Sequence, residues 1–509
     1  MRALPAVLAL VLLVVLAPAA EAAGFGLGPT VFRDYEVGGV NSAPEPTIGI
    51  PWNTDSLFFH AGSTTIKGVF AADDNVTWSD VTPPYQVPTN LDPMLVADED
   101  TGRILAGGLH GPCSVMMYSD DDGATWLPTG NMCSGAQFDH QSIGIGPKPM
   151  VGNPQNLPQL QNAYYCGQLG QIGCSVSFDG GVTWTAPTPS TGACGGFHGH
   201  WRISRVTGAA FLPVGDCGNQ RGLLAVTAIS SVTGFQFEPR LVAGSHPWIA
   251  GFDPSIGISR DNGWVYYGDA DHKGAFMALS KNEGNTWEQL PGADGTLTTW
   301  VDVGAFHDPP IVAATFADVQ AGDDDRAAFT FMGIEWHPDI DLDYVQSDMI
   351  FSCADRQDEL VWHYYAAFTY DAGQNWTVTR VSADPVQVGG VYDSLGGHTG
   401  GCRNLLDFND MDIDSKGRAH IGYADGCIGE CAEVPSVESQ GARSQAPRVL
   451  RQVAGNGLFA AFDVEAPGTP PVVVDPTPTG PTEQPTESVP GFGVLGLLAC
   501  LAVLLARRR

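Results

Sequence analysis

Carboxylate and imidazole side chains recur immediately before short apolar segments along most of this 509-residue chain. Glu45, Asp92 and Asp253 each precede a proline and then an apolar segment, and the pair Asp139-His140 precedes a similar segment. Two carboxyl groups at a suitable separation can act as acid and base on a glycosidic bond, and carboxylates with imidazoles can hold a divalent cation. The pattern therefore suggests glycan chemistry or metal binding. An Asp before Pro can instead simply cap the turn into a strand, and this structural alternative stays open.

A second repeat indicates which elements position these residues. Ser119-Asp120-Asp121-Asp122-Gly123-Ala124-Thr125-Trp126 returns from Ser177 and Ser280, and more loosely from Thr369 and Ala72. The Asp can accept backbone N–H groups, the Gly can take a positive φ, and the Trp can bury a large ring. Together they predict a tight hairpin turn pinned to a core. The structural residues of these turns are Asp121, Asp179, Asp371, Trp126, Trp184, Trp287 and Trp376.

The turn motif resembles the Asp box, or BNR repeat, of sialidase-like β-propellers, over roughly residues 44 to 465. In that family the box is a structural turn away from the active site, so the resemblance implies a fold more strongly than an activity. Counting the apolar units gives seven inner strands, which begin near Glu45, Asp92, Asp139, Trp201, Asp253, Asp308 and Asp410. The sequence predicts an all-β, seven-bladed β-propeller of four-stranded antiparallel blades with Asp-box hairpins, six blades being the alternative. Degenerate hairpin turns are expected at 230–234 and 460–463.

In a propeller the strand starts gather around one end of the central channel, which defines the candidate site. The catalytic candidates are Asp139, Asp253 and Asp308. The ligand-binding candidates are His140, His200, Arg202, His307 and Arg403. The metal candidates are Asp92 and Asp410, with calcium as the expected cation. Asp410-x-Asp412-x-Asp414 lacks the Glu that closes a full calcium loop, so a strand followed by a turn is the better interpretation.

Sialidase activity is not favoured, although the family resemblance implies it as one function. Such enzymes use three Arg residues, a Tyr/Glu pair, an Asp and a Phe/Tyr-Arg-Ile-Pro motif in the first blade. The first blade here has Pro44-Glu45-Pro46-Thr47-Ile48, and the nearest likeness is the mid-chain Trp201-Arg202-Ile203-Ser204. An acidic ring would also repel an anionic sugar. The leading hypothesis is binding of a carbohydrate or a cell-surface partner; the alternatives are a glycoside hydrolase using channel carboxylates and a structural module without a ligand.

The composition and the two chain ends indicate an exported, anchored protein. A net charge of −32 argues against nucleic acid as a partner. Residues 1–23 are typical of a signal peptide, 24–465 form the propeller, and 466–489 form a Pro/Thr-rich linker. Residues 490–509 resemble the PGF-CTERM sorting signal of archaeal surface proteins, which implies processing by an archaeosortase; a plain C-terminal membrane anchor is the alternative.

Ten of the eleven cysteines fall in the exported part, and an even number in an oxidising compartment predicts disulfides. Proximity in sequence favours three pairs, which are Cys113 with Cys133, Cys166 with Cys174, and Cys194 with Cys217. A zinc site at Cys427-x-x-x-Cys431 is a weaker hypothesis, because no second pair has the spacing of a metal site.

Overall fold

The computed structural model describes residues 29–84, 91–110, 113–130, 132–133, 140–148, 161–169, 171–189, 194–230, 234–246, 253–346, 360–391, 403–436 and 444–463. These belong to one compact unit, Met1–Glu465, whereas the second unit, Ala466–Arg509, lies outside the described residues. The signal peptide, linker and sorting signal therefore stay predictions. Across the described part of the chain, none of the helices has the length and apolar character to cross a membrane.

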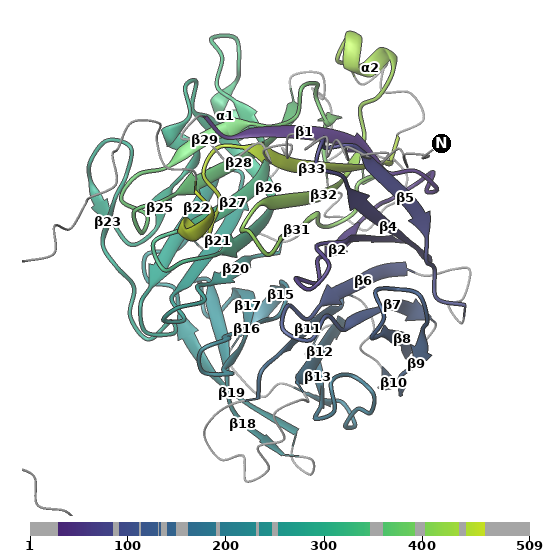
Figure 1. Ribbon diagram of the computed structural model, residues 1–509. Coiled ribbons are helices and arrows are strands. Elements are labelled where there is room, and N and C mark those ends of the chain that lie inside the picture. Colours follow the sequence, from purple (N-terminus) through teal and green to yellow (C-terminus); the bar gives the residue numbers. More distant parts are fainter. Residues whose placement is uncertain are drawn as a thin grey trace, which may run out of the picture. The chain divides into compact units, whose positions relative to one another are not determined.

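Seven antiparallel sheets surround a channel, so the unit is a seven-bladed β-propeller, as predicted (Figure 1). Listed from the channel outward, blade 1 comprises β2 (Thr47–Gly49), β3 (Leu57–Ala61), β4 (Thr64–Phe70) and β5 (Val76–Asp80). Blade 2 comprises β6 (Leu91–Ala97), β7 (Ile104–His110), β8 (Cys113–Ser119) and β10 (Met132–Cys133), with β9 (Leu127–Pro128) also on β8. Blade 3 comprises β11 (Ser142–Gly146), β12 (Asn162–Leu169), β13 (Gln171–Ser177) and β14 (Thr188–Pro189).

Blade 4 has a divided inner strand, β15 (Gly195–His198) and β16 (Arg202–Ile203), followed by β17 (Ala210–Asp216), β18 (Gly222–Ser230) and β19 (Gly234–Leu241). Blade 5 comprises β20 (Ser255–Ile258), β21 (Val265–Asp271), β22 (Gly274–Ser280) and β25 (Val301–Asp302), and β23 (Leu290–Pro291) and β24 (Leu297–Thr298) form a separate hairpin. Blade 6 comprises β26 (Ile311–Ala321), β27 (Ala327–Glu335), β28 (Val361–Thr369) and β29 (Thr377–Arg380), with β30 (Gln387–Val388) also on β28. The described helices are single turns, α1 (Leu342–Val345), α2 (Glu430–Glu433), η1 (Gly304–Phe306) and η4 (Ala460–Phe462).

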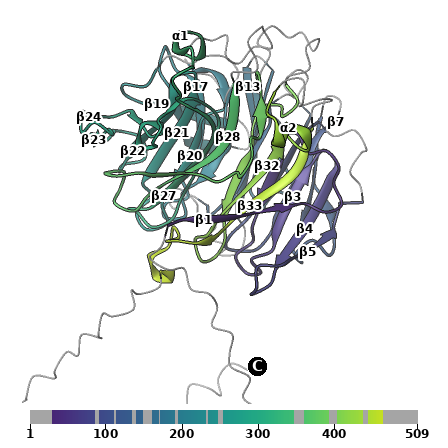
Figure 2. The same cartoon turned by 90° about the horizontal axis from the view of Figure 1, so that it is seen from above.

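Blade 7 closes the propeller with strands from both ends of the unit. Its order is β31 (Asp410–Ile413), β32 (Ala419–Asp425), β33 (Ala446–Ala454) and β1 (Val31–Glu36). The N-terminal strand β1 pairs antiparallel with β33, with Glu36 opposite Arg448, and Figures 1 and 2 show the two strands side by side. The sequence-based prediction of a hairpin turn at 460–463 is wrong, because the fourth strand of this blade comes from the N-terminus and residues 460–462 form η4 instead.

The hydrophobic core lies between adjacent blades rather than at the centre. Ile48 and Phe59 of blade 1 pack with Val449 of blade 7, and Phe58 on the opposite face of β3 packs with Leu95 of blade 2. Similar clusters fill the spaces between the other neighbouring blades. Alternation along each strand explains this arrangement, because successive side chains enter different spaces. Burying each of these large side chains contributes about 1.5–3 kcal/mol.

The repeated Ser/Thr-x-Asp motif forms the same turn after the third strand of blades 2, 3, 5 and 6. In blade 3, Asp179 accepts the backbone N–H and the hydroxyl of Thr183, at 2.8 and 2.7 Å, and Gly181 N–H donates to Ser177 Oγ at 2.7 Å. Asn282 takes the place of the Asp in blade 5 and accepts the N–H of Thr286 at 2.8 Å. The turns are therefore held by one hydrogen-bond pattern, as their sequences predict.

The Trp of the motif fixes its turn to neighbouring backbone. Trp126 and Trp376 are buried, and the Trp126 indole donates to Val81 O of the preceding blade at 2.8 Å. Trp287 Nε1 donates likewise to Leu241 O, at 2.7 Å, whereas Trp184 Nε1 donates to Gly181 O of its own turn at 3.1 Å. Trp376 differs, because it packs in the core between blades 5 and 6 and its Nε1 has no hydrogen-bond partner among the described residues.

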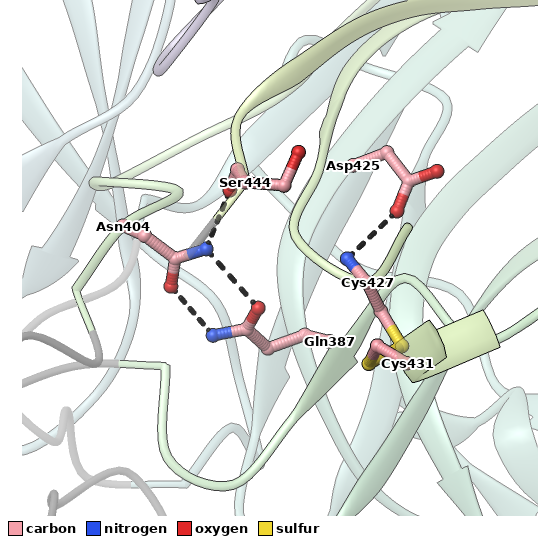
Figure 3. Close-up of a disulfide and its surroundings, with 6 residues drawn as sticks. All are labelled: Gln387, Asn404, Asp425, Cys427, Cys431 and Ser444. Atoms are coloured by element: carbon pink, nitrogen blue, oxygen red, sulfur yellow. Dashed lines mark hydrogen bonds between the residues drawn. A yellow bond between two sulfur atoms is a disulfide. The ribbon is translucent and has the colours of Figure 1, made fainter. Parts of the chain in front are cut away.

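Two of the three predicted disulfides are present, Cys166–Cys174 and Cys194–Cys217. Cys113 is also disulfide-bonded, and Cys133 stands opposite it in the β8–β10 register, although the Cys133 side chain lies outside the described residues. Cys427 and Cys431 form a further disulfide beside a network of Gln387, Asn404 and Ser444 (Figure 3). The alternative zinc site at this pair is therefore wrong, since both sulfurs are oxidised.

Candidate functional site

Side chains from one blade cap the exposed edge of the next blade's inner strand. An innermost strand has one edge without a strand partner, and a buried N–H there needs an acceptor. Two capping groups come from hydroxyls: Ser142 Oγ accepts Trp201 N–H at 2.8 Å, and Ser255 Oγ accepts Val319 N–H at 3.1 Å. The recurring polar residues of the inner strands thus have a structural task.

Carboxylates perform the same task around blades 6, 7 and 1. Asp318 Oδ2 accepts Met411 N–H at 2.6 Å, Asp410 Oδ2 accepts Ile48 N–H at 2.9 Å, and Asp412 Oδ2 accepts Ile50 N–H at 2.7 Å. Asp318 also accepts the Ser255 hydroxyl, so it joins blades 5, 6 and 7. These carboxylates lock neighbouring blades together.

Ionisable side chains gather where the inner strands begin, and we call Glu45, Asp92, His140, His198, Asp253 and Asp407 the carboxylate–histidine ring. Glu45, Asp92 and His140 hold the same left-handed backbone conformation, with φ of 51°, 47° and 55°. Asp92 accepts His140 N–H at 3.2 Å, and Asp253 Oδ1 lies 2.7 Å from His140 Nε2. Glu45, His140, His198 and Asp253 are buried, with Glu45 3% and Asp253 7% exposed, whereas Asp92 and Asp407 are half-buried.

Burial and neighbouring charges shift the pKa values of the two histidines in the ring. Burial alone would lower the pKa of His140, but Asp253, helped by Asp407 and Asp92, raises it to about 9. Burial, together with the neighbouring His140, lowers the pKa of His198 to about 3. At neutral pH the ring therefore contains one imidazolium and one neutral imidazole, which is an ion-paired arrangement rather than a pair of free carboxylates.

Glu45 differs from the other ring carboxyls. Burial, with the charges of Asp407 and Asp92, raises its pKa well above the usual range. Glu45 Oε1 accepts Asp407 N–H at 3.0 Å, while Oε2 has no hydrogen-bond partner among the described residues. The Asp407 carboxylate is held by Arg403, whose Nε donates to it at 2.9 Å. Glu45 is therefore a buried carboxyl with a raised pKa beside an Arg-paired Asp407.

Two basic side chains of blade 4 reach across the channel to carboxylates of blades 6 and 7. His200 Nδ1 lies 3.8 Å from Asp410 Oδ1 of blade 7, and an Arg202 guanidinium nitrogen lies 3.4 Å from Asp318 Oδ1 of blade 6. Burial raises the pKa of Asp318 to about 6, with Arg202 acting in the opposite direction. These contacts cross the channel interior.

A cavity of about 110 Å³ lies in the channel below the ring. Its polar lining includes Thr47, Ser142, His200, Arg202, Gln320, Asp410 and Asp412. It extends to the turns between first and second strands, where Asp98, Glu99, Asp100, Arg205 and Arg260 line it. Since one ordered water needs only about 10–15 Å³ by this kind of measure, the cavity holds several waters or a small polar ligand.

Aromatic side chains form part of the wall at the turn end of the cavity. Trp52 and Phe459 meet edge to face, with centroids 5.3 Å apart, and Trp52 Nε1 donates to Ile413 O at 2.9 Å. The guanidinium of Arg205 lies 4.6 Å from the Trp52 ring, and that of Arg260 lies 3.8 Å from the Phe459 ring. The cavity thus combines aromatic faces with charged and hydroxyl groups, as carbohydrate sites do.

The predicted site residues separate into those at the channel and those away from it. Asp92, His140, Asp253, His200, Arg202, Arg403 and Asp410 all contribute to the ring or to the contacts below it. Asp139 lies outside the described residues. His307 and Asp308 do precede the sixth inner strand, since β26 begins at Ile311, but the His307 ring lies 5.3 Å from the Tyr365 ring of the third strand, β28, rather than among the ring residues.

The long strand β26 explains that correction. Its register shifts between Thr315 and Asp318, and the part that contacts blade 7 begins at Asp318. Asp308 is exposed ahead of the strand, and His307 Nδ1 instead contacts Pro309 O at 2.7 Å. The sequence signal that was missed is Asp318 itself, the single carboxylate within the otherwise apolar stretch Ile311–Val319.

Asp407, Asp412 and Thr47 were also not among the predicted site residues. Asp412 was correctly placed in a strand, since β31 covers Asp410–Ile413 and a turn follows, in which Gly417 N–H donates to Asp414 O at 2.8 Å. Alternation along β31 places Asp410 and Asp412 on one side, and this could have identified Asp412. Thr47 shares the Ser/Thr-Ile-Gly-Ile sequence of Ser142 and Ser255, which could have identified it. Asp407 carries no sequence signal beyond proximity to a strand start.

Metal binding gains no geometric support from the described residues. Within these ranges no three His, Cys, Asp or Glu side chains converge as a metal site. Asp92 and Asp410 instead accept backbone N–H groups. Calcium binding stays an untested prediction.

No protein-family model and no curated protein matches the chain. Solved structures do match. YCF48 from Cyanidioschyzon merolae aligns at 10% identity with a TM-score of 0.43, over 83% of this chain and 98% of that chain. The fucose-specific lectin from Aleuria aurantia aligns at 11% identity with a TM-score of 0.39, over 72% of this chain and 100% of the lectin. AofleA from Arthrobotrys oligospora aligns at 10% identity with a TM-score of 0.39, over 74% and 97%. These similarities concern the fold alone.

Proposed function

We propose that this protein is a binding propeller that takes a carbohydrate in its channel cavity and does not cleave it. The observation that carries the proposal is the cavity itself, in which hydroxyl, amide, carboxyl and guanidinium groups stand beside aromatic walls. Carbohydrate recognition needs this mixture, because each sugar hydroxyl both donates and accepts while the ring carbons favour an apolar surface. The alternative occupant within the same proposal is a cell-surface component with similar groups.

The state of the predicted catalytic carboxylates supports binding over hydrolysis. Asp253 is paired with His140 in a buried contact, and Asp308 is exposed ahead of β26. Asp318 and Asp410 cap the backbone of neighbouring blades. Carboxylates committed in this way lack the freedom that acid and base groups need on either side of a glycosidic bond.

The proposal also places the protein outside the cell, on its membrane surface. Three described disulfides support an oxidising compartment. Residues 1–23 and 490–509 support export and anchoring through their sequences. Mass spectrometry of the protein purified from its native membrane tests this part: we expect the first peptide to start near Ala23 and the tail beyond 490 to be absent. Recovery of both intact termini would contradict it.

Binding is tested by titrating the full-length protein against a glycan array that contains neutral, cationic and anionic sugars. Val96 lines the cavity, so Val96→Phe fills it and should abolish any glycan binding. Val69→Phe is the matched control, since Val69 is 48% exposed on β4 outside the cavity. Equal binding by both variants would place the ligand elsewhere, and no binding by the unmodified protein would overturn the proposal.

A second candidate function, glycoside hydrolysis, is favoured by one observation, the position of the buried Glu45, whose pKa is raised, beside the backbone and side chain of Asp407. A carboxyl with a raised pKa next to a second carboxyl is the arrangement that a general acid and its partner require. Glu45→Gln keeps the shape of the side chain and should reduce product release from a glycan library at least a hundredfold if this function operates. Absence of release by the unmodified protein would remove it, and Val69→Phe again serves as the control.

A further inference from the structure

The arginines that line the cavity are already neutralised by carboxylates. Arg202 meets Asp318, and Arg260 meets Asp323 at 2.7 Å. Arg205 contacts both Glu99 and Asp100. The cationic side chains at the wall therefore leave little free positive charge for an anionic ligand.

Asp412 forms no ion pair with any Lys, Arg or His of the described residues. Among the described residues, the hydrogen bonds to its carboxylate come from two backbone N–H groups, those of Ile50 at 2.7 Å and Ile413 at 2.8 Å. An ionised carboxylate has about four acceptor directions, so half of them remain available. Burial, with the negative charges of Glu99 and Asp410, raises the pKa of Asp412 well above the usual range. A cation placed beside Asp412 would relieve this unfavourable environment.

A buried hydroxyl on the adjacent blade is independently without a partner. Thr47 is 3% exposed, lines the cavity, and its Oγ1 has no hydrogen-bond partner within the part of the chain that the structure describes. Thr47 stands two residues after the left-handed Glu45, just as Ser142 stands two residues after the left-handed His140. Ser142 uses its hydroxyl to cap the next blade, whereas Thr47 does not. An unpaired buried hydroxyl is costly unless a ligand or water completes it.

Thr47 and Asp412 lie on the same side of the cavity. Asp410 and Asp412 of blade 7 accept from Ile48 and Ile50, which follow Thr47 along blade 1. Trp52 continues from the same strand and donates to Ile413 O, so it closes this side with an aromatic wall. Thr47, Asp412 and the Trp52 indole therefore line the same cavity, and the Asp412 carboxylate has no counterion among the described residues.

We infer that the cavity ligand is an amino sugar, whose protonated amine pairs with Asp412 and one of whose hydroxyls pairs with Thr47 Oγ1. This inference rests on the proposed function and specifies the class of carbohydrate. A protonated amine supplies the charge that Asp412 lacks, and charge-assisted hydrogen bonds of this kind are stronger than neutral ones. The same charge explains why the cavity would reject neutral and N-acetylated analogues.

Calorimetric titration of the full-length protein tests the inference, with glucosamine, galactosamine and mannosamine as probes and the matched hexoses and N-acetylhexosamines as competitors. We expect at least one hexosamine to bind about tenfold or more tightly than both of its analogues. Asp412→Asn should remove this preference. Thr47→Val should weaken binding about three- to tenfold without lowering the melting temperature, because the hydroxyl has no hydrogen-bond partner in the described part of the chain.

The possible failures separate the two proposals. Equal affinity for a hexosamine and its neutral analogues, or an unchanged preference in Asp412→Asn, would overturn the amino-sugar inference and leave carbohydrate binding intact. No binding of any sugar on the broader array would overturn both. Should Asp412→Asn prove unstable, Thr47→Val decides the matter, since unchanged affinity in that variant contradicts the placement of the ligand.

Discussion

The seam between blades 7 and 1 and the seam between blades 1 and 2 use similar polar residues to different effect. On the first seam, Asp410 and Asp412 accept the N–H groups of Ile48 and Ile50. On the second, Thr47 lines the cavity at a position equivalent to that of the capping Ser142, yet its buried hydroxyl has no hydrogen-bond partner among the described residues. The residue type alone therefore does not decide whether a polar group holds the fold or awaits a ligand. The role of the polar group depends on whether the neighbouring blade offers it an N–H group.

The strongest test of this contrast removes a capping carboxylate. Asp318→Ala should destabilise the protein by about 3–5 kcal/mol, because it leaves Arg202 without its buried partner and Met411 N–H without an acceptor. Chemical denaturation measures the loss. Asp318→Asn, which retains an acceptor oxygen, should lose less. A change below 1 kcal/mol in the Ala variant would mean that these contacts do not lock the blades.

The next largest effect concerns pH. The pKa of His140 is raised to about 9 from an ordinary 6.5, so its ion pair with Asp253 stabilises the fold fully below pH 6.5. That contribution is lost as the pH rises through 9, and it amounts to about 3 kcal/mol. Melting temperatures measured from pH 6 to pH 10 should fall in the unmodified protein and fall less in His140→Gln. Parallel pH profiles for the two proteins would contradict the pairing.

A hydroxyl cap is expected to matter less than a carboxylate. Ser142→Ala removes the acceptor of Trp201 N–H and should cost about 1–2 kcal/mol. Denaturant midpoints with unchanged m values would show that the loss comes from the native contact. A neutral result would indicate that water or another group satisfies this N–H equally well.

The smallest effect is expected at the equivalent residue of blade 1. Thr47→Val keeps the side-chain volume nearly constant and removes a hydroxyl that has no partner in the described structure. Its stability should stay within about 0.5 kcal/mol of the unmodified protein, or increase. A loss as large as that of Ser142→Ala would show that Thr47 does cap its neighbour, and the contrast between the seams would disappear.

The blade architecture was predictable from sequence because it depends on local signals that repeat. Each Ser-x-Asp-x-Gly turn contains its own acceptors and its own left-handed Gly, such as Gly181, so the turn needs no distant partner to be recognised. The outermost strand of blade 7 was not predicted, because β1 pairs with a strand from the far end of the unit. Nothing in the residues 31–36 specifies that partner.

Site residues were predictable only where the inner strand that follows them is regular. Asp253 and His140 precede regular strands, and both reach the ring. Asp308 has the same Asp-Pro signal, yet the irregular β26 shifts the channel position to Asp318. Asp253 is paired, whereas Asp412 has no counterion among the described residues. This difference depends on contacts between blades that sequence spacing does not encode.

The pairing of β1 with β33 has a consequence for how the chain folds. The strand β1 is synthesised early and its partner β33 late, so the nascent chain carries an unpaired strand edge until β33 has been made. Until Arg448 arrives opposite Glu36, the incomplete ring can accept the β1 of another molecule in place of its own. Low local concentration of unfinished chains therefore favours monomers, and crowding at the point of synthesis favours exchanged dimers.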